Sequence, residues 1–212
     1  MRAVVFDMDG VLLDSETVYE LAWREAAGML GLDGIDEVHS KVLGMDEKGC
    51  IETLQGRYGK DFDAKGFWDL TTDLSVKYME EKGIPLKPYA REILLYLKAK
   101  EYPLALATSN DRGFAQDVLR DSALLDFFDS AVYGNDISKS KPEPEIYLKA
   151  CEKLGVAPGN TVAVEDSPNG IKSAWSAGLK TVMVPDRIQP DDELLKSVWN
   201  LLPDLKSLEK IL

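Results

Sequence analysis

The sequence predicts an α/β fold in which a Rossmann-like, doubly wound parallel sheet carries a helical domain inserted after its first strand. Three observations lead to this prediction. Short apolar runs alternate with helical segments, one interval between the runs is far longer than the others, and the length of 212 residues suits one domain with an insertion. Such alternation is typical of a parallel sheet with helices on both faces.

The strands are predicted from short runs of apolar and β-branched residues that end at charges or turn residues. These runs are Ala3–Phe6, Leu104–Ala107, Ser130–Tyr133, Val162–Val164 and Thr181–Val184. Periodic apolar residues between the runs predict helices over Ala90–Lys100, Phe114–Leu125, Glu145–Leu154 and Ile171–Ala177. A closing amphipathic helix is predicted over Leu205–Leu212.

The interval between the first and second strands breaks the alternation, because at about ninety residues it far exceeds an ordinary crossover. Apolar residues recur at helical spacing from Val18 to Leu30, and Gly31 follows where a helix would end. Further helices are predicted over Glu47–Tyr58 and Gly66–Lys82. We therefore predict a helical domain at residues 15–87 inserted into a core formed by residues 1–14 and 88–212.

The composition limits the partners of this protein. A net charge of −12 disfavours binding to nucleic acid and to anionic membranes. Two cysteines, Cys50 and Cys151, are too few for a disulfide framework. The apolar start runs directly into Asp7, so it does not have the pattern of a signal peptide, and no apolar run is long enough to span a membrane. We expect a cytoplasmic protein with a small-molecule partner; the oligomeric state is not determined, and a monomer is compatible with the sequence.

Two carboxylates follow the first predicted strand in Asp7-Met8-Asp9-Gly10. Side chains two residues apart on an extended chain share a face, and Gly10 lets the chain turn away. Two carboxylates held together repel one another unless a cation neutralises them, and Mg²⁺ is a suitable cation for oxygen ligands. An acidic turn that merely closes the strand is the alternative.

Polar residues also follow the later strands. Thr108-Ser109-Asn110 comes directly after Leu104–Ala107, where hydroxyl and backbone N–H groups can bind a phosphate; an ordinary helix N-cap is the alternative. Lys141 lies between Ser140 and a pair of prolines that would restrict its backbone. A solvated lysine is the alternative there, and Lys139 is a rival for the same role.

Glu165 and Asp166 follow Val162–Val164 and precede Ser167 and Pro168, which are predicted as the N-cap and first residue of a helix. The two acids would then lie at the strand tip, available to a metal; an acidic loop without function is the alternative. Ligands of open α/β sheets bind at the carboxyl ends of the strands, so we predict that the four polar clusters form one site.

The segments DMDGVLLD (Asp7–Asp14), LATSN, KPEPEIY and VEDSPNGI, in this order, resemble the four motifs of the haloacid dehalogenase superfamily. The resemblance extends over essentially the whole chain, and the layout is similar to that of the β-phosphoglucomutase-like phosphatases within it. The helical insertion resembles the C1 cap domain of the superfamily.

The resemblance implies roles for these residues. Asp7 would be the nucleophile that forms an aspartyl-phosphate, and Asp9 the general acid and later the base. The residues that would bind phosphate or substrate are Thr108, Ser109, Asn110 and Lys141, and Thr108 and Lys141 would also assist catalysis. Those that would hold Mg²⁺ are Asp7, Asp9 through its backbone carbonyl, Asp166 and, close by, Glu165.

The residue Asp9 also bears on the reaction type. Dehalogenases of the superfamily lack an acid/base residue at the matching position, because a halide leaves without a proton. Phosphoryl transfer is therefore favoured, and the resemblance implies an Mg²⁺-dependent phosphatase that hydrolyses a small phosphorylated metabolite, such as a sugar phosphate.

The resemblance further implies that the cap selects the substrate by closing over the core site. The cap residues predicted to contact substrate are Tyr19, Trp23, Gly44, Glu47 and Lys48. Packing between cap helices is the alternative for the two aromatic residues. In β-phosphoglucomutases a histidine and an arginine stand where Tyr19 and Glu47 stand here, so the sequence favours hydrolysis over the mutase reaction.

Two alternatives to a phosphatase remain. The first is a phosphosugar mutase of the β-phosphoglucomutase type. The second is a signalling receiver domain, which also combines a phosphorylated aspartate with a hydroxyl residue, a lysine and Mg²⁺. Receiver domains lack a helical insertion after the first strand and an acidic pair after the lysine, so residues 15–87 and Glu165-Asp166 argue against that assignment.

Overall fold

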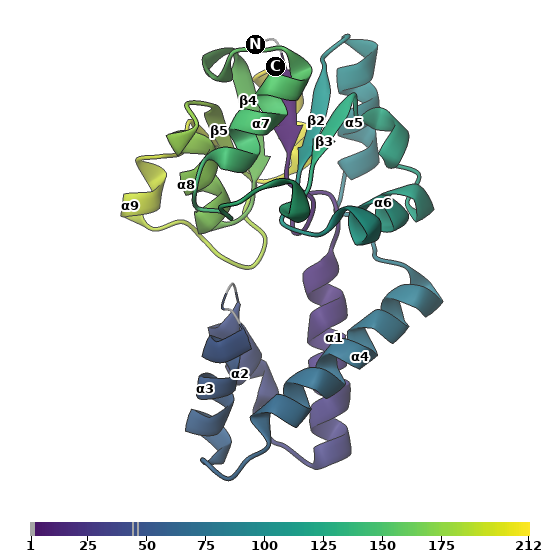
Figure 1. The fold of residues 1–212 in the computed structure, drawn as a ribbon, viewed down its shortest axis with the longest axis vertical. Helices are drawn as coiled ribbons and strands as arrows, with labels where there is room; N and C mark the ends of the chain where they lie inside the picture. Colours follow the sequence, from purple (N-terminus) through teal and green to yellow (C-terminus); the bar gives the residue numbers. More distant parts are fainter. Residues whose placement is uncertain (1–2, 44, 46) are drawn as a thin grey trace. The chain divides into compact units, whose positions relative to one another are not determined.

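A computed structural model describes residues 3–43, 45 and 47–212 of the chain. In this structure the chain divides into two compact units (Figure 1). The α/β unit comprises Met1–Asp14 and Pro85–Leu212, and the helical unit comprises Ser15–Ile84. Among the described residues, none of the helices is both long enough and apolar enough to cross a membrane.

The α/β unit is built on a parallel sheet of six strands in the order β3-β2-β1-β4-β5-β6. Its strands are β1 (Ala3–Phe6), β2 (Leu104–Ala107), β3 (Ser130–Val132), β4 (Thr161–Glu165), β5 (Lys180–Met183) and β6 (Asn200–Leu201). The predicted α/β class and parallel sheet are confirmed. The short edge strand β6 was not predicted, because the partly buried Asn200 and the exposed Leu201 form no apolar run.

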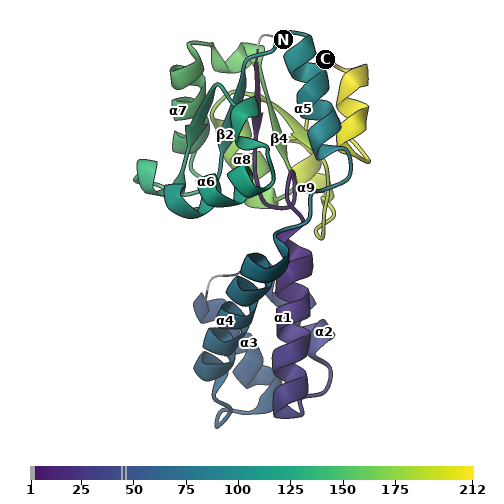
Figure 2. The same cartoon turned by 90° about the vertical axis from the view of Figure 1, so that its right-hand side faces the viewer.

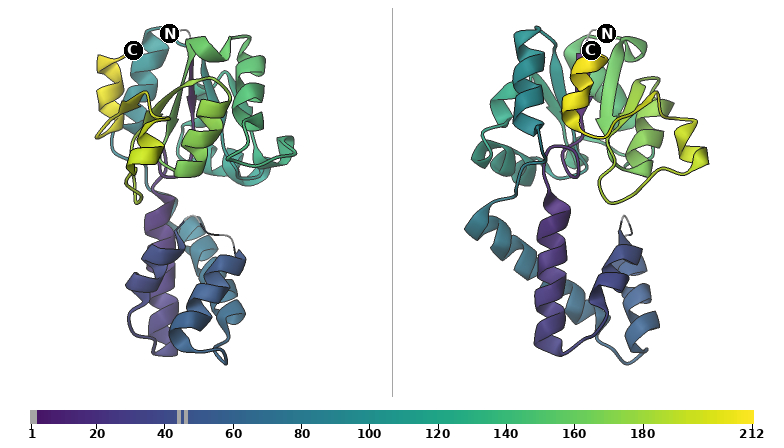
Figure 3. Two further views of the ribbon diagram at one scale, coloured as in Figure 1. Left: turned by 90° about the vertical axis from the view of Figure 1, so that its left-hand side faces the viewer. Right: turned by 180° about the vertical axis from the view of Figure 1, so that it is seen from behind.

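Helices cover both faces of this sheet. They are α5 (Ala90–Ala99), α6 (Arg112–Asp121), α7 (Glu145–Leu154), α8 (Pro168–Ser176) and α9 (Asp192–Leu195), with the 3₁₀ helices η1 (Leu125–Phe127), η2 (Gly134–Asp136), η3 (Pro158–Asn160) and η4 (Leu205–Lys210). Figure 2 shows α7 on one side of the sheet and α5 on the other. In Figure 3 η4, coloured yellow, lies beside α5, with which it packs.

The predicted closing helix is present, and it is the 3₁₀ helix η4, which ends at Lys210 rather than at Leu212. Asp204 caps this helix by accepting from the N–H of Ser207 at 2.8 Å. Leu205 and Leu208 are both buried, and residues three apart share a face in a 3₁₀ helix. The tighter helix therefore directs both leucines into the core.

The order of the strands determines where a ligand would bind. The chain runs outward from β1 to β2 and β3, and then returns to β4 on the other side of β1. In the register, Phe6 stands opposite Leu106 on one neighbour and Val164 on the other, so these three strands end side by side. The point between β1 and β4 where the order reverses is the usual binding crevice of an open α/β sheet.

The helical unit consists of α1 (Ser15–Leu30), α2 (Ile35–Val42), α3 (Glu47–Tyr58) and α4 (Ala64–Lys82). Gly31 adopts a positive φ of 65°, as a glycine that ends a helix does, and this prediction is confirmed. Each helix contributes to one apolar core that includes Ala22, Trp23, Val38, Leu54 and Phe67.

The helical unit ends at Ile84 rather than at residue 87. Leu86 forms an antiparallel bridge with Leu13, and the N–H of Lys87 donates to the carbonyl of Leu12 at 2.9 Å. The N–H of Asp14 likewise donates to the carbonyl of Pro85 at 2.8 Å. These backbone bonds hold the outgoing and returning chain together, so the returning residues belong to the α/β unit.

Candidate active site

Asp7 and Asp9 follow β1 at the reversal point of the sheet. The N–H of Asp7 donates to the carbonyl of Val164 at 3.0 Å, and the residue is buried, with 8% of its surface exposed. After Asp9 the chain turns at Gly10, whose φ is +72°. A Cβ at position 10 would lie 2.2 Å from Oδ2 of Asp166, so this close approach requires glycine.

Lys141 forms the centre of the site. Its Nζ donates to Oδ1 of Asp7 at 2.6 Å, to Oε1 of Glu165 at 2.6 Å and to the carbonyl of Ala107 at 3.1 Å. Its side chain is only 8% exposed. Lys139, the rival in the sequence, is exposed, and its backbone N–H donates to Glu145. The structure therefore brings Lys141, and not Lys139, to the two carboxylates.

Glu165 is fully buried and bonded through both carboxylate oxygens. Oε1 accepts from Lys141 and, at 2.7 Å, from the hydroxyl of Tyr147. Oε2 accepts from the N–H of Asp166 at 3.2 Å and from the hydroxyl of Ser167 at 3.1 Å. This bonding holds Glu165 in a single orientation beside Lys141.

Tyr147 is a residue of the site that the sequence analysis missed. It is fully buried on α7, and Nζ of Lys141 lies 5.2 Å from the centre of its ring. Burial and the nearby carboxylate of Glu165 raise its pKa well above the ordinary value. In the sequence, its place in an apolar stripe of a helix indicated only a core residue, and its hydroxyl carried no separate signal.

Three carboxylates converge at the reversal point. Asp7, Glu165 and Asp166 each present a ligand atom, and these atoms all lie within 4.8 Å of one another. Burial raises the pKa of Asp7 to about 7. The charges of Glu165 and Asp9 also raise this pKa, whereas the charge of Lys141 lowers it. Burial and the charges of Glu165 and Asp7 also raise the pKa of Asp166 well above its ordinary value.

This donor set fits a hard divalent cation. All three donors are carboxylate oxygens, which Mg²⁺ prefers over nitrogen or sulfur ligands. Burial is the main cause of the raised pKa values of Asp7 and Asp166, and the charge of Lys141 lowers both only in part. A bound cation would favour the ionised form of both groups.

The residues after β2 form a loop ahead of α6. Thr108 is fully buried, and its Oγ1 accepts from the N–H of Asn110 at 3.1 Å, whereas Ser109 is exposed. The alternative that this segment supplies the helix N-cap is wrong: Asp111 caps α6 by accepting from the N–H of Phe114 at 3.1 Å. The loop is thus left available for another role.

The side chain of Asn110 faces Asp9. Its Nδ2 donates to Oδ2 of Asp9 at 2.5 Å and is 3.2 Å from Oγ1 of Thr108. Asp9 and Asn110 are both partly buried.

The predicted N-cap of the helix after β4 is confirmed, because Ser167 accepts from the N–H of Gly170 at 3.1 Å ahead of Pro168.

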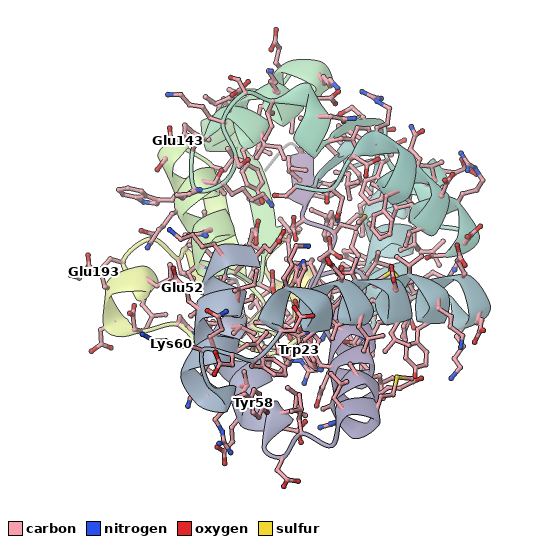
Figure 4. All side chains as sticks on the ribbon, turned by 60° about the horizontal axis from the view of Figure 1, so that its bottom comes forward. Trp23, Glu52, Tyr58, Lys60, Glu143 and Glu193 are labelled. Atoms are coloured by element: carbon pink, nitrogen blue, oxygen red, sulfur yellow. The ribbon has the colours of Figure 1, made fainter. Side chains whose placement is uncertain are left out.

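The candidates in the helical unit have different environments. Trp23, labelled in Figure 4, is buried in the core of this unit, and its ring lies edge-on to His39 and Phe67. This environment agrees with the alternative that Trp23 packs between helices rather than contacting substrate. Tyr19 is partly buried. Glu47 forms an ion pair with Lys65 at 3.3 Å. The remaining candidates are Lys48, whose side chain is 82% exposed, and Gly44, which lies outside the described residues.

Comparison with known proteins identifies the family. The family model described as haloacid dehalogenase-like hydrolase matches residues 1–178. The chain belongs to this family. A phosphorylated carbohydrates phosphatase of Thermotoga maritima is 35% identical over 188 residues, which cover 86% of this chain and 84% of the relative.

Two further relatives of this haloacid dehalogenase-like hydrolase differ in the reaction or ligand that their names give. The β-phosphoglucomutase of Bacillus subtilis is 27% identical over 190 residues, covering 87% of this chain and 83% of the relative. A solved haloacid dehalogenase family hydrolase of Deinococcus radiodurans, with bound phosphate and sodium, has a TM-score of 0.85 at 25% identity, covering 100% of this chain and 94% of that chain. The predicted family, fold and enzyme class of phosphoric monoester hydrolase are confirmed.

Proposed function

We propose that this hydrolase is an Mg²⁺-dependent phosphatase that acts on a small phosphorylated metabolite, such as a sugar phosphate, through an aspartyl-phosphate on Asp7. The observation that carries the proposal is the buried group of Asp7, Lys141 and Glu165 at the reversal point of the sheet. A desolvated carboxylate held by a lysine is a suitable nucleophile toward phosphorus, because the lysine offsets the repulsion between two anions.

In the first step, a carboxylate oxygen of Asp7 attacks phosphorus and the bond from phosphorus to the ester oxygen breaks. Asp9 donates its proton to the leaving oxygen, which departs as the alcohol. In the second step, a water attacks the phosphorus of the aspartyl-phosphate while Asp9 takes a proton from it. The bond from phosphorus to Asp7 then breaks, and inorganic phosphate and the free carboxylate are formed.

The groups around Asp7 would bind the phosphoryl oxygens. A phosphate dianion is repelled by the acidic cluster, so a nearby positive charge is a physical requirement, and Lys141 provides it. The exposed Ser109 can offer its backbone N–H, and the hydroxyl of Thr108 lies beside it. These donors would stabilise the charge that spreads over the phosphoryl oxygens in the transition state.

Asp7, Asp166 and the backbone carbonyl of Asp9 would hold Mg²⁺. When bound, the ion screens the carboxylates and stabilises charge on the transferring phosphoryl group. Both oxygens of Glu165 already accept hydrogen bonds, from Lys141 and Tyr147 on one side and from the Asp166 segment on the other. This supports a role for Glu165 next to the metal rather than as its principal ligand.

We assign substrate selection to the helical unit, acting as a cap. The support is the family membership and the exposure of Glu47 and Lys48, which leaves their side chains able to contact a ligand. Tyr19 is a further candidate in this unit.

The experiment that tests this function is a screen of the purified protein against phosphorylated metabolites, with Mg²⁺ and with EDTA. β-Glucose 1-phosphate is included, and both inorganic phosphate and glucose 6-phosphate are measured. We expect phosphate release that requires Mg²⁺. Isomerisation without phosphate release would instead support a mutase, as in the relative from Bacillus subtilis. Absence of both products would contradict the proposed function.

A further inference from the structure

The side chain of Asn110 has both of its donor protons committed within the α/β unit. An asparagine amide carries two N–H donors and one acceptor oxygen. Nδ2 of Asn110 contacts Oδ2 of Asp9 at 2.5 Å and Oγ1 of Thr108 at 3.2 Å. An ionised carboxylate has no donor, so when Asp9 is ionised the opposite orientation of the amide would place two acceptor oxygens against each other, and Nδ2 is the atom that faces Asp9. The remaining oxygen is an acceptor and cannot bind a phosphate oxygen.

The backbone of Asn110 is held from two sides. Its N–H donates to Oγ1 of Thr108 at 3.1 Å, and its carbonyl accepts from the N–H of Gly134 at 2.7 Å. Gly134 follows β3, and a Cβ at that position would lie 2.1 Å from the carbonyl oxygen of Ser109. The close contact between these two loops requires glycine, and it limits the directions in which the Asn110 amide can point.

This arrangement restricts the carboxyl group of Asp9. An N–H donor facing Oδ2 leaves no room for a proton on that oxygen, so a proton that Asp9 transfers must be carried by Oδ1. The contact also opposes rotation of the carboxyl group. A general acid is effective only when its proton lies within hydrogen-bond reach of the leaving oxygen.

We propose that Asn110 is a positioning residue that orients Asp9 toward the leaving oxygen, rather than a ligand of the phosphate. The inference rests on the proposed function, in which Asp9 is the general acid. It predicts a specific kinetic signature, because a general acid matters most when the leaving group is a poor one.

The test compares two substrates in the full-length protein. One is p-nitrophenyl phosphate, whose leaving group departs as a stable anion and needs no acid, and the other is the sugar phosphate that the wild-type enzyme hydrolyses best. The parameter kcat/KM reports steps up to the departure of the alcohol or phenol. We expect Asn110→Ala to lower kcat/KM for the sugar phosphate by about 10- to 100-fold, and for p-nitrophenyl phosphate by less than about threefold.

Three reference variants make the result interpretable. Asp9→Asn should show the same selectivity for the leaving group in a stronger form. Asn110→Asp, which replaces the donor by a like charge, should reproduce the selectivity of Asn110→Ala and covers the case in which that variant does not fold. Asn135→Ala is the matched control: Asn135 accepts from the N–H of Arg112 at 3.3 Å in the same pair of loops, and its loss should affect both substrates equally.

Equal losses on both substrates in the Asn110 variants would overturn the inference and indicate phosphate binding, and so would the absence of any loss. If Asp9→Asn itself shows no selectivity, the assigned role of Asp9 fails, and with it the inference. Failure of the wild-type enzyme to release phosphate from either ester would overturn the proposed function as a whole.

Discussion

The α/β unit and the helical unit place their charged candidate residues in different environments. In the α/β unit Asp7, Thr108 and Glu165 are buried; the two carboxylates accept from Lys141, and the hydroxyl of Thr108 accepts from the backbone N–H of Asn110. In the helical unit the candidate charges of Glu47 and Lys48 are exposed, and the interior is an apolar core around residues such as Trp23.

This difference in burial separates residues suited to the chemical step from residues suited to contact with the substrate. Burying charged groups is costly unless they are paired, so a buried group of three carboxylates and one lysine is retained at the expense of stability. Exposed side chains on helices carry no such cost and can be exchanged freely. Under the proposed function, the buried groups of the α/β unit would perform the chemical step, and the exposed side chains of the helical unit would contact the substrate.

The strongest test of this contrast is Asp7→Asn. The variant lacks a nucleophile, so kcat should fall by at least about 10³-fold. It also removes one of the mutually repelling carboxylates, so the free energy of unfolding, measured in urea, should not fall. Asp126→Asn, at an exposed aspartate of η1, is the control and should change neither quantity. A normal kcat in Asp7→Asn would refute the mechanism.

The second test compares the two lysines. Lys141→Ala leaves Asp7 and Glu165 buried without their cation, so we expect a loss of about 3 kcal/mol in stability and a fall of about 10²-fold in kcat/KM. Lys139→Ala, at an exposed side chain, should stay within about 0.5 kcal/mol and about twofold. Urea denaturation and steady-state kinetics measure both effects, and the reverse ranking would assign the phosphate contact to Lys139.

The third test removes a single hydroxyl group. Tyr147→Phe takes one hydrogen bond from the buried carboxylate of Glu165, so the free energy of unfolding should fall by about 1–2 kcal/mol and kcat/KM by about tenfold. Tyr89→Phe, at a tyrosine that is 41% exposed, should leave both unchanged. Equal stability of the Tyr147→Phe variant and the wild type would show that the hydroxyl does not support Glu165.

The last test makes the same substitution in one helix of each unit, and its Gly28 arm has the smallest expected effect. At Gly28 in α1 a Cβ would meet no atom within 4 Å, so Gly28→Ala should raise the free energy of unfolding by about 0.5–1 kcal/mol. At Gly170 in α8 a Cβ would lie 1.9 Å from Cδ of Glu165, so Gly170→Ala should lower it by about 1–3 kcal/mol. Thermal and urea unfolding compare the two, and effects of the same sign would contradict the packing described around Glu165.

The sequence by itself predicted most of the sheet and the edge at which the site lies. Strands such as Ala3–Phe6 and Leu104–Ala107 were predicted with their observed bounds, because a fully buried parallel strand is a short apolar run with polar ends. The order of the motifs then placed their polar residues at neighbouring strand tips. The sequence also predicted α3 and α7 with their observed bounds, and for α7 the apolar stripe of an amphipathic helix supplied a local signal.

The tertiary structure alone decided which side chains meet. Lys141 and Asp7 are 134 residues apart in the chain, and Asn110 and Asp9 are 101 apart. Whether Lys141 or Lys139 reaches the carboxylates, and whether Asn110 faces a phosphate or Asp9, depends on backbone direction in loops rather than on local preference. The hydroxyl of Tyr147 gained its role only because folding brought a buried carboxylate within 2.7 Å of it. Local sequence determines strands and helices, whereas contacts between distant side chains exist only once the sheet has assembled.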